Sequence, residues 1–169
     1  MSVTLLQDHR KCNELEDDRK SCLHVLTWTA LHFTNHTISG GSASRFLGAF
    51  DEEYEDKQDV KGGDLRMEFL VAHEIPYMVK FDCQPQLDAL VGELTETFSV
   101  CYKEPPSAKD LQVLEDVWVA NVPESVMTNL LALYDQKHLD DLASPSWFVD
   151  TFCHHLNVNI WPLSDEAQG

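Results

Sequence analysis

Apolar residues recur at helical spacing along most of this chain, most densely over residues 22–33. Hardly any side of that segment is polar, its apolar positions being Leu23, Val25, Leu26, Trp28, Ala30, Leu31 and Phe33. A helix that is apolar all round is typical of the interior of a domain, so we expect the central helix here. The acids of residues 14–18 precede it, where the helix dipole favours negative charge.

Two further segments follow the glycine pair Gly40-Gly41, which we expect to break the chain. Residues 43–54 carry apolar side chains at spacings of three and four and predict a helix. Residues 51–63 are rich in acids and end in two glycines, which indicates a solvated helix end followed by a turn.

The next segments also predict helices. Residues 65–75 form a short one, which Pro76 should end because proline disfavours helical geometry in the residue before it. Residues 85–100 carry one apolar stripe behind a proline. Residues 108–118 fit a helix but also end in a possible short strand, and residues 124–138 follow a proline at a favourable first position.

The last helix has a recognisable start. Ser144 is a suitable N-cap, Pro145 suits the first helical position, and Trp147, Phe148 and Phe152 share one face with Leu156. Together these segments predict a mainly α single domain of about six helices around a central apolar helix. The domain should cover residues 1–163, with a flexible tail at 164–169.

Charge restricts the possible partners. The 169 residues include 29 acidic and 12 basic side chains, a formal net charge of -17. Such a chain repels phosphate backbones, so neither nucleic acid nor an anionic membrane surface is expected to bind. No apolar run reaches 18 residues, and the first residues lack the apolar core of a secretory signal, which predicts a cytoplasmic or nuclear protein. Its five irregularly spaced cysteines are expected to be reduced thiols.

Residue types that could carry catalysis or bind a metal occur, but their patterns favour structural roles. His32 and His36 stand four residues apart, a spacing that can bind zinc, yet the glutamate of a zinc-protease motif is absent. Of His154 and His155, at most one should face the core. The cysteines with apolar surroundings, Cys22, Cys101 and Cys153, are more readily explained by packing. We expect no catalytic, cofactor-binding or metal-binding residue.

Adjacent carboxylates along the chain are typical of solvated turns. Asp18 is the exception, because it precedes a fully apolar helix. We expect its side chain to be buried and hydrogen-bonded to the backbone.

Residues 15–28, LEDDRKSCLHVLTW, closely resemble the "DDLES...hvLtW" signature of the fungal-type protein kinase domain family, abundant in mushroom-forming fungi. Residues 1–6, MSVTLL, look like that family's "FMS..LL" stretch. Later pieces occur in the family's order, which extends the resemblance over almost the whole chain: Lys61-Gly62-Gly63, residues 94–98, residues 102–106 and residues 147–152.

The resemblance implies the helical lower lobe of a kinase fold, with Asp17, Asp18, Ser21 and Trp28 as structural signature residues. Asp18 would be the aspartate that opens the central F helix and braces the catalytic loop. The chain departs from the signature at Arg19 and Lys20, where the family usually has Leu and Glu. That departure implies altered local contacts.

A kinase also needs a glycine-rich loop, a strand lysine, an HRD loop and a DFG motif, and none of these occurs in the sequence. The chain as given is therefore expected not to be an enzyme and to need no cofactor. Three functions remain open. The first is a noncatalytic, kinase-derived module that binds a protein partner or itself through surface left by the missing lobe. The second is a fragment of an active kinase, and the third is an unrelated acidic helical adaptor.

Overall fold

The computed structural model describes residues 2–7, 12, 14–56, 59–119 and 131–158. Its elements in chain order are α1 (Val3–Gln7), α2 (Leu15–Phe33), α3 (Gly40–Gly48), β1 (Tyr54–Asp56), β2 (Asp59–Lys61), α4 (Asp64–Val71), α5 (Glu74–Met78), α6 (Pro85–Ser99), the 3-10 helix η1 (Val100–Tyr102), α7 (Ala108–Val119), α9 (Leu131–Ala143) and α10 (Trp147–Val158). The expectation of a mainly α domain is confirmed. The described residues hold more helices than the expected six, because short helices such as α1 and α5 join the longer ones. No helix in these ranges is both long and apolar enough to cross a membrane.

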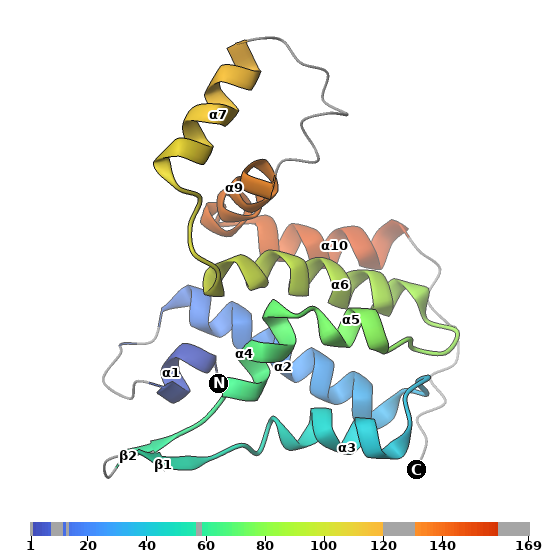
Figure 1. Cartoon of the computed structure of the whole chain (residues 1–169). Helices are drawn as coiled ribbons and strands as arrows, with labels where there is room; N and C mark the ends of the chain where they lie inside the picture. Colours follow the sequence, from blue (N-terminus) through green and yellow to red (C-terminus); the bar gives the residue numbers. More distant parts are fainter. Residues whose placement is uncertain (1, 8–11, 13, 57–58, 120–130, 159–169) are drawn as a thin grey trace.

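Helix α6 is the central element, since it contacts α2, α4, α5, α9 and α10. Figure 1 shows it between α10 on one side and the layer of α2, α4 and α5 on the other. Its sequence explains this position. Pro85 occupies the first helical turn, where its missing N–H costs nothing. The expected apolar stripe of the helix is buried at Leu87, Leu90, Val91, Leu94 and Phe98.

The expectation that residues 22–33 form the central, fully buried helix is wrong. These residues belong to α2, which begins seven residues earlier, at Leu15. Leu23 and Leu31 on its inner face are buried, but Val25 is 62% exposed and Phe33 is 51% exposed. The helix covers one side of α6, so only one of its faces reaches the core.

Two apolar clusters make up the described core. The first joins α2, α3, α4, α5 and α6, with the rings of Phe46 and Phe69 in edge contact at 4.8 Å. The second joins α2, α4 and α6 to α10, around Phe98. Leu26 of α2 packs against both clusters and so links them.

The segment after α2 differs from the sequence prediction. Helix α3 starts at Gly40 instead of residue 43, because the Ser39 hydroxyl accepts a hydrogen bond from the Ser42 N–H and caps the helix. Strand β1 pairs with β2 as an antiparallel ribbon, where a helix end and a turn were expected. Gly62 follows the ribbon, and a Cβ there would lie 2.1 Å from the Glu52 carbonyl oxygen, so glycine is required.

The predicted helix over residues 65–75 is also divided differently. Helix α4 ends at Val71, and His73 then adopts the left-handed conformation with φ of 53°. Pro76 does not end a helix; it lies in the first turn of α5, where no intrahelical N–H bond is lost.

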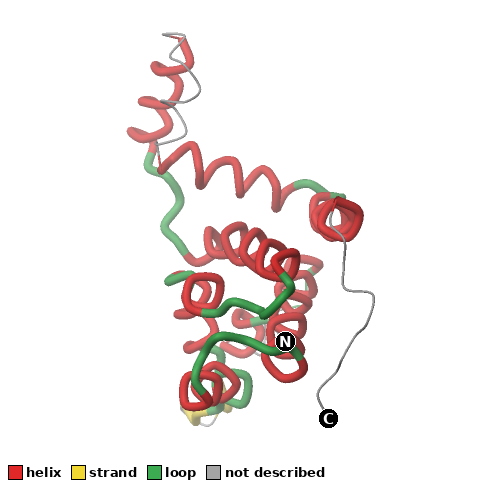
Figure 2. Tube along the Cα trace, turned by 90° about the vertical axis from the view of Figure 1, so that its right-hand side faces the viewer, coloured by secondary structure: helices red, strands yellow, loops and turns green. Residues whose placement is uncertain are grey.

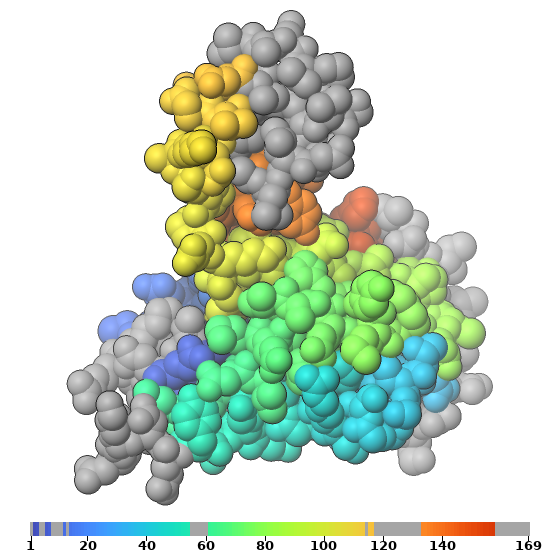
Figure 3. Space-filling view, in the orientation of Figure 1, coloured from blue at the N-terminus to red at the C-terminus, as the bar shows by residue number. Residues whose placement is uncertain are grey.

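Toward the C-terminus, the ambiguous segment over residues 108–118 is helical, as α7. Figures 1 and 2 both show α7 projecting from the rest of the molecule, and Figure 3 shows the same projection with atoms filled in. The predicted helix over residues 124–138 is described only from Leu131, as α9. The flexible tail predicted at 164–169 lies outside the described residues.

The predicted cap of the last helix is wrong by about two residues, because α10 begins at Trp147. The Ser144 N–H donates to the carbonyl oxygens of Asp140 and Asp141, so Ser144 closes the end of α9 instead. Trp147 and Phe148, both partly buried, pack against the α6 cluster and so place the start of α10.

Candidate functional site

Of the two signature aspartates, the structure buries Asp17 and exposes Asp18. The Asp17 side chain is completely buried, whereas Asp18 lies on the surface. The prediction of a buried Asp18 was therefore off by one residue. Helical phase would have identified Asp17, because buried residues of α2 recur at Asp17, Lys20, His24, Thr27 and Leu31.

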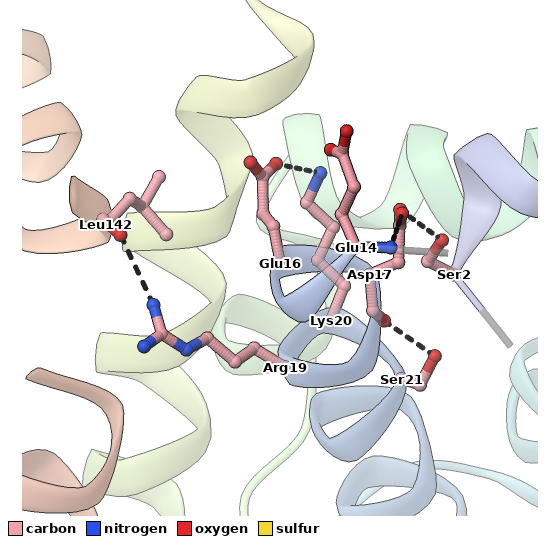
Figure 4. A network of polar contacts seen from close by, with 8 residues as sticks. All are labelled: Ser2, Glu14, Glu16, Asp17, Arg19, Lys20, Ser21 and Leu142. Atoms are coloured by element: carbon pink, nitrogen blue, oxygen red, sulfur yellow. Dashed lines mark hydrogen bonds and ion pairs between the residues drawn. The ribbon is translucent and has the colours of Figure 1, made fainter. Parts of the chain in front are cut away.

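The Asp17 carboxylate joins the start of α2 to the N-terminal segment, as Figure 4 shows. One oxygen accepts a hydrogen bond of 2.7 Å from the Ser2 hydroxyl. The other accepts one of 3.2 Å from the backbone N–H of Glu14, the residue that caps α2. Asp17 thus accepts a hydrogen bond from the N–H of the capping residue and from Ser2 beside it, and joins the two at the helix start.

The other two signature residues make local contacts. The Ser21 hydroxyl donates to the Asp17 carbonyl oxygen at 2.8 Å, within the same helix. Trp28 stacks on His32 with 4.2 Å between ring centroids. The structure therefore brings Ser21 and Asp17 together, whereas Trp28 lies about three turns beyond Asp17 along α2.

Arg19, which departs from the family signature, is a structural residue in this chain. Its side chain is 9% exposed. The guanidinium donates to the carbonyl oxygens of Leu142, Ser144 and Pro145, at 3.3, 3.4 and 2.8 Å. These carbonyls belong to the last turn of α9 and to the connection between α9 and α10, so Arg19 holds this part of the chain against α2.

We expect Arg19→Leu, which restores the residue usual in the family, to lower the free energy of unfolding by about 1–3 kcal/mol, because it leaves three carbonyl oxygens without their donor. Urea denaturation measures the change. Arg45→Leu is the matched control, since the Arg45–Glu74 pair is exposed on one side and should contribute less than about 1 kcal/mol. Equal losses in the two variants would contradict this role for Arg19.

Lys20, the second departure, is also buried. Its ammonium pairs with Glu16 one turn before it and lies 5.2 Å from the Tyr102 ring centroid. Burial raises the pKa of the neighbouring Cys101 thiol to about 11. Such a thiol stays protonated at neutral pH and is a poor nucleophile, which fits the expected packing role of Cys101.

In the described part of the chain, the histidines and cysteines do not form a metal-binding cluster. Among described residues, no three His, Cys, Asp or Glu side chains are placed to share a metal ion. His36 lies beyond the end of α2, where its Nε2 approaches the Leu31 carbonyl oxygen at 3.2 Å. His155 is buried with Nε2 2.8 Å from Glu93, whereas His154 is exposed, as at most one was expected to face inward. The cysteines Cys22 and Cys153 are exposed, not packed as expected.

An open groove of about 880 Å³ lies between α2 and α10 in the described part of the chain. Its floor and walls are mainly apolar, from Val25, Leu26, Phe148, Val149 and Phe152. Val25 and Val149 are 62% and 60% exposed, so their side chains face solvent. The groove's other lining residues are Asp18, Ser21, Cys22, Thr29 and Cys153.

Sequence reasoning did not identify this groove. Val25 was assigned to a helix buried on all sides, since it lies in a dense apolar run. The available signal was that α2 has apolar residues on more sides than one neighbouring helix can cover.

His24 precedes Val25 on α2 and, unlike Val25, is buried, with the Arg66 guanidinium near it. Desolvation, followed by the positive charge of Arg66, lowers the pKa of His24 from 6.5 to about 3. Its neutral form is therefore favoured in the folded chain. Because the folded pKa lies below the unfolded one, the contribution to stability is complete above pH 6.5 and is lost as pH falls toward 3.

We expect His24 to steepen acid destabilisation by about 1.4 kcal/mol for each pH unit between roughly 6 and 3.5. The measurement is the free energy of unfolding from urea curves at half-unit pH intervals. His24→Gln should flatten the curve in this window, whereas His154→Gln, at an exposed position of α10, serves as the control. Parallel curves for the wild type and His24→Gln would contradict the assignment.

Comparison of the chain with models of protein families, with curated proteins and with solved structures found no match.

Proposed function

We propose that this chain is a noncatalytic helical module that binds a protein partner through the groove between α2 and α10. The observation that carries the proposal is the exposure of Val25 and Val149 in one continuous apolar groove of about 880 Å³. An apolar groove of this size on a folded surface is typical of a protein interaction site. Two helices with a groove between them suit an amphipathic helix, which would place one apolar face there.

Charge favours a basic partner. The exposed carboxylates of the two helices are Asp18 and Asp150, together with Glu16, which is paired with Lys20. Their Lys and Arg side chains, Lys20 and Arg19, are buried and engaged in contacts within the chain. A partner helix with apolar residues on one face and Lys or Arg along its edges would complement this arrangement. A second copy of the chain would bring another formal charge of -17 against it.

The resemblance of residues 15–28 to the fungal-type protein kinase family supports a derivation of this module from a kinase lower lobe. Under that proposal, α2 corresponds to the family's F helix and Asp17 takes the bracing position that Asp18 was expected to hold. The sequence contains no HRD or DFG motif and no glycine-rich phosphate loop, which supports a noncatalytic role for this chain. Mg-ATP should leave its melting temperature unchanged.

Two other functions lead to different results. If the chain is part of an active kinase, a longer transcript would encode the missing motifs in frame with it. If it is an unrelated acidic adaptor, the groove could still bind a partner, but the match of Asp17 and Ser21 to the kinase-family signature would be accidental.

The test uses a fluorescent 18-residue peptide helix with leucines on one face and lysines on the others, titrated with the full chain. We expect Val149→Asp to weaken binding at least about tenfold, because it puts a charge in the apolar groove. Val71→Asp is the matched control, since Val71 is 40% exposed on α4, outside the groove, and should change affinity less than about twofold.

A second peptide replaces every lysine with glutamate, and the charge argument requires it to bind more weakly. Equal affinities of the Val149→Asp and Val71→Asp chains for the lysine peptide would refute the groove as the binding site. The remaining possibility is that the chain binds a second copy of itself through the groove. Sedimentation of the unmodified chain tests this, because a concentration-dependent dimer that Val149→Asp abolishes would show self-association.

A further inference from the structure

A second pocket, of about 370 Å³, lies on the other side of Val25 from the groove. Its lining comes from α1, α2 and α4 and from the segment after α3: Leu6, His24, Val25, Trp28, Phe50, Glu52, Glu53 and Arg66. A smaller chamber of about 20 Å³ shares His24, Phe50 and Arg66 with it. The chamber holds about one water molecule, whereas the outer pocket is large enough for a small organic group.

His24 is an unusual group to find between these two spaces. Its side chain is 6% exposed, and its Nε2 has no hydrogen-bond partner among the described residues. A buried ring nitrogen without a partner normally costs stability, so it calls for a donor or acceptor from outside the chain. Since the folded chain favours neutral His24, one ring nitrogen can accept a hydrogen bond.

Two carboxylates line the pocket and could face a positive ligand. Glu52 and Glu53 both line it, and Glu53 is exposed to solvent. One Glu52 oxygen accepts hydrogen bonds from the N–H groups of Gly63 and Leu65, which fixes the carboxylate at the start of α4. The pocket therefore presents one carboxylate held in a fixed position, Glu52, and one that is exposed, Glu53.

Arg66 is the cation of the pocket, and its contacts turn it toward the backbone. Its guanidinium donates to the carbonyl oxygens of Ala49 and Phe50, at 3.0 and 2.9 Å. The same group lies 5.5 Å from the Phe50 ring centroid. The carboxylates of Glu52 and Asp51 carry charge opposite to its own.

Aromatic side chains complete the pocket. Trp28 and Phe50 lie on its wall together with Val25. Aromatic faces attract organic cations, and the indole of tryptophan does so most strongly. Carboxylates, aromatic rings and a neutral hydrogen-bond acceptor together match an alkylammonium or guanidinium group attached to an apolar chain.

We propose that this pocket binds an organic cation, with its N–H group donating to His24, its charge facing Glu52 and Glu53, and its apolar part against Trp28. The ligand is either a free amine or a Lys or Arg side chain of a protein partner, and both have the same recognising chemistry. The site stands independently of the groove, although Val25 borders both.

The test titrates the full, isotopically labelled chain with n-butylammonium and follows backbone amide shifts by NMR. We expect saturable shifts at residues lining the pocket, and weaker binding of uncharged n-butanol by about tenfold or more. Glu53→Gln should weaken n-butylammonium binding about three- to tenfold, since it removes an exposed carboxylate of the pocket. The matched control is Asp51→Asn, which removes a nearby carboxylate that does not line the pocket. It should change the affinity for n-butylammonium by less than about twofold.

His24→Phe tests the hydrogen bond, because it should weaken n-butylammonium but not tetramethylammonium, which has no N–H. If this variant fails to fold, the Glu53→Gln comparison still decides. Equal binding of n-butanol and n-butylammonium, or equal effects of Glu53→Gln and Asp51→Asn, would overturn the proposal.

The lysine peptide used for the groove identifies the source of the cation. If Glu53→Gln also weakens that peptide, a partner side chain enters the pocket; if only n-butylammonium is affected, the ligand is a free amine. Failure of the peptide to bind would remove the groove proposal alone, because the n-butylammonium titration does not involve the groove.

Discussion

Replacing Phe98 with alanine should lower the free energy of unfolding by about 3–5 kcal/mol, the largest effect we expect from a single core substitution. Phe98 is fully buried on α6. Its ring meets Trp147 in edge contact at 5.8 Å and lies 6.2 Å from Phe148, both on α10. The alanine variant therefore leaves a cavity where α6 joins α10.

The matched control is Phe33→Ala, the same chemical change at a side chain that is 51% exposed at the end of α2. It should cost less than about 1 kcal/mol. Urea denaturation followed by circular dichroism measures both variants, and Phe98→Leu supplies a milder change if the alanine variant does not fold. Similar losses for Phe98→Ala and Phe33→Ala would show that α6 is not the centre of the core.

The second large effect concerns the buried carboxylate. Asp17→Ala should lower the free energy of unfolding by about 2–3 kcal/mol, because it leaves the Ser2 hydroxyl and the Glu14 N–H without a charged acceptor. Asp18→Ala is the matched control one residue away, on the exposed side of α2, and should cost less than about 1 kcal/mol. Thermal and urea unfolding give both values.

A double-mutant cycle separates the contact with Ser2 from the general cost of the change. Ser2→Ala combined with Asp17→Ala should show a coupling of about 1 kcal/mol, since the two side chains share a hydrogen bond of 2.7 Å. A larger loss from Asp18→Ala than from Asp17→Ala would restore the sequence-based choice of Asp18.

Local patterns predicted the helices that have one clear apolar face. Helix α6 is the best example, because Pro85 marks its start and five residues of its stripe are buried. Prediction failed where the apolar residues of a segment cover several faces, as in α2. There the pattern indicates a helix but does not say which face meets the core.

The same limit explains the error at the candidate site. Asp17 and Asp18 are adjacent acids with the same chemistry, and only the phase of α2 against α6 decides that Asp17 is inside. Arg19 was interpreted as a lost apolar contact, because its carbonyl partners lie more than 120 residues later in the chain. No local pattern reports such a contact.

Taken alone, the sequence determined that this chain is mainly helical and strongly acidic, because spacing and charge are properties of the residues themselves. It also placed the start of α6 through Pro85. Tertiary structure decided which helix is central, which aspartate is buried, and that α2 and α10 leave an apolar groove between them. These features depend on how distant helices pack, and one-dimensional periodicity does not specify which of several apolar faces finds a neighbour.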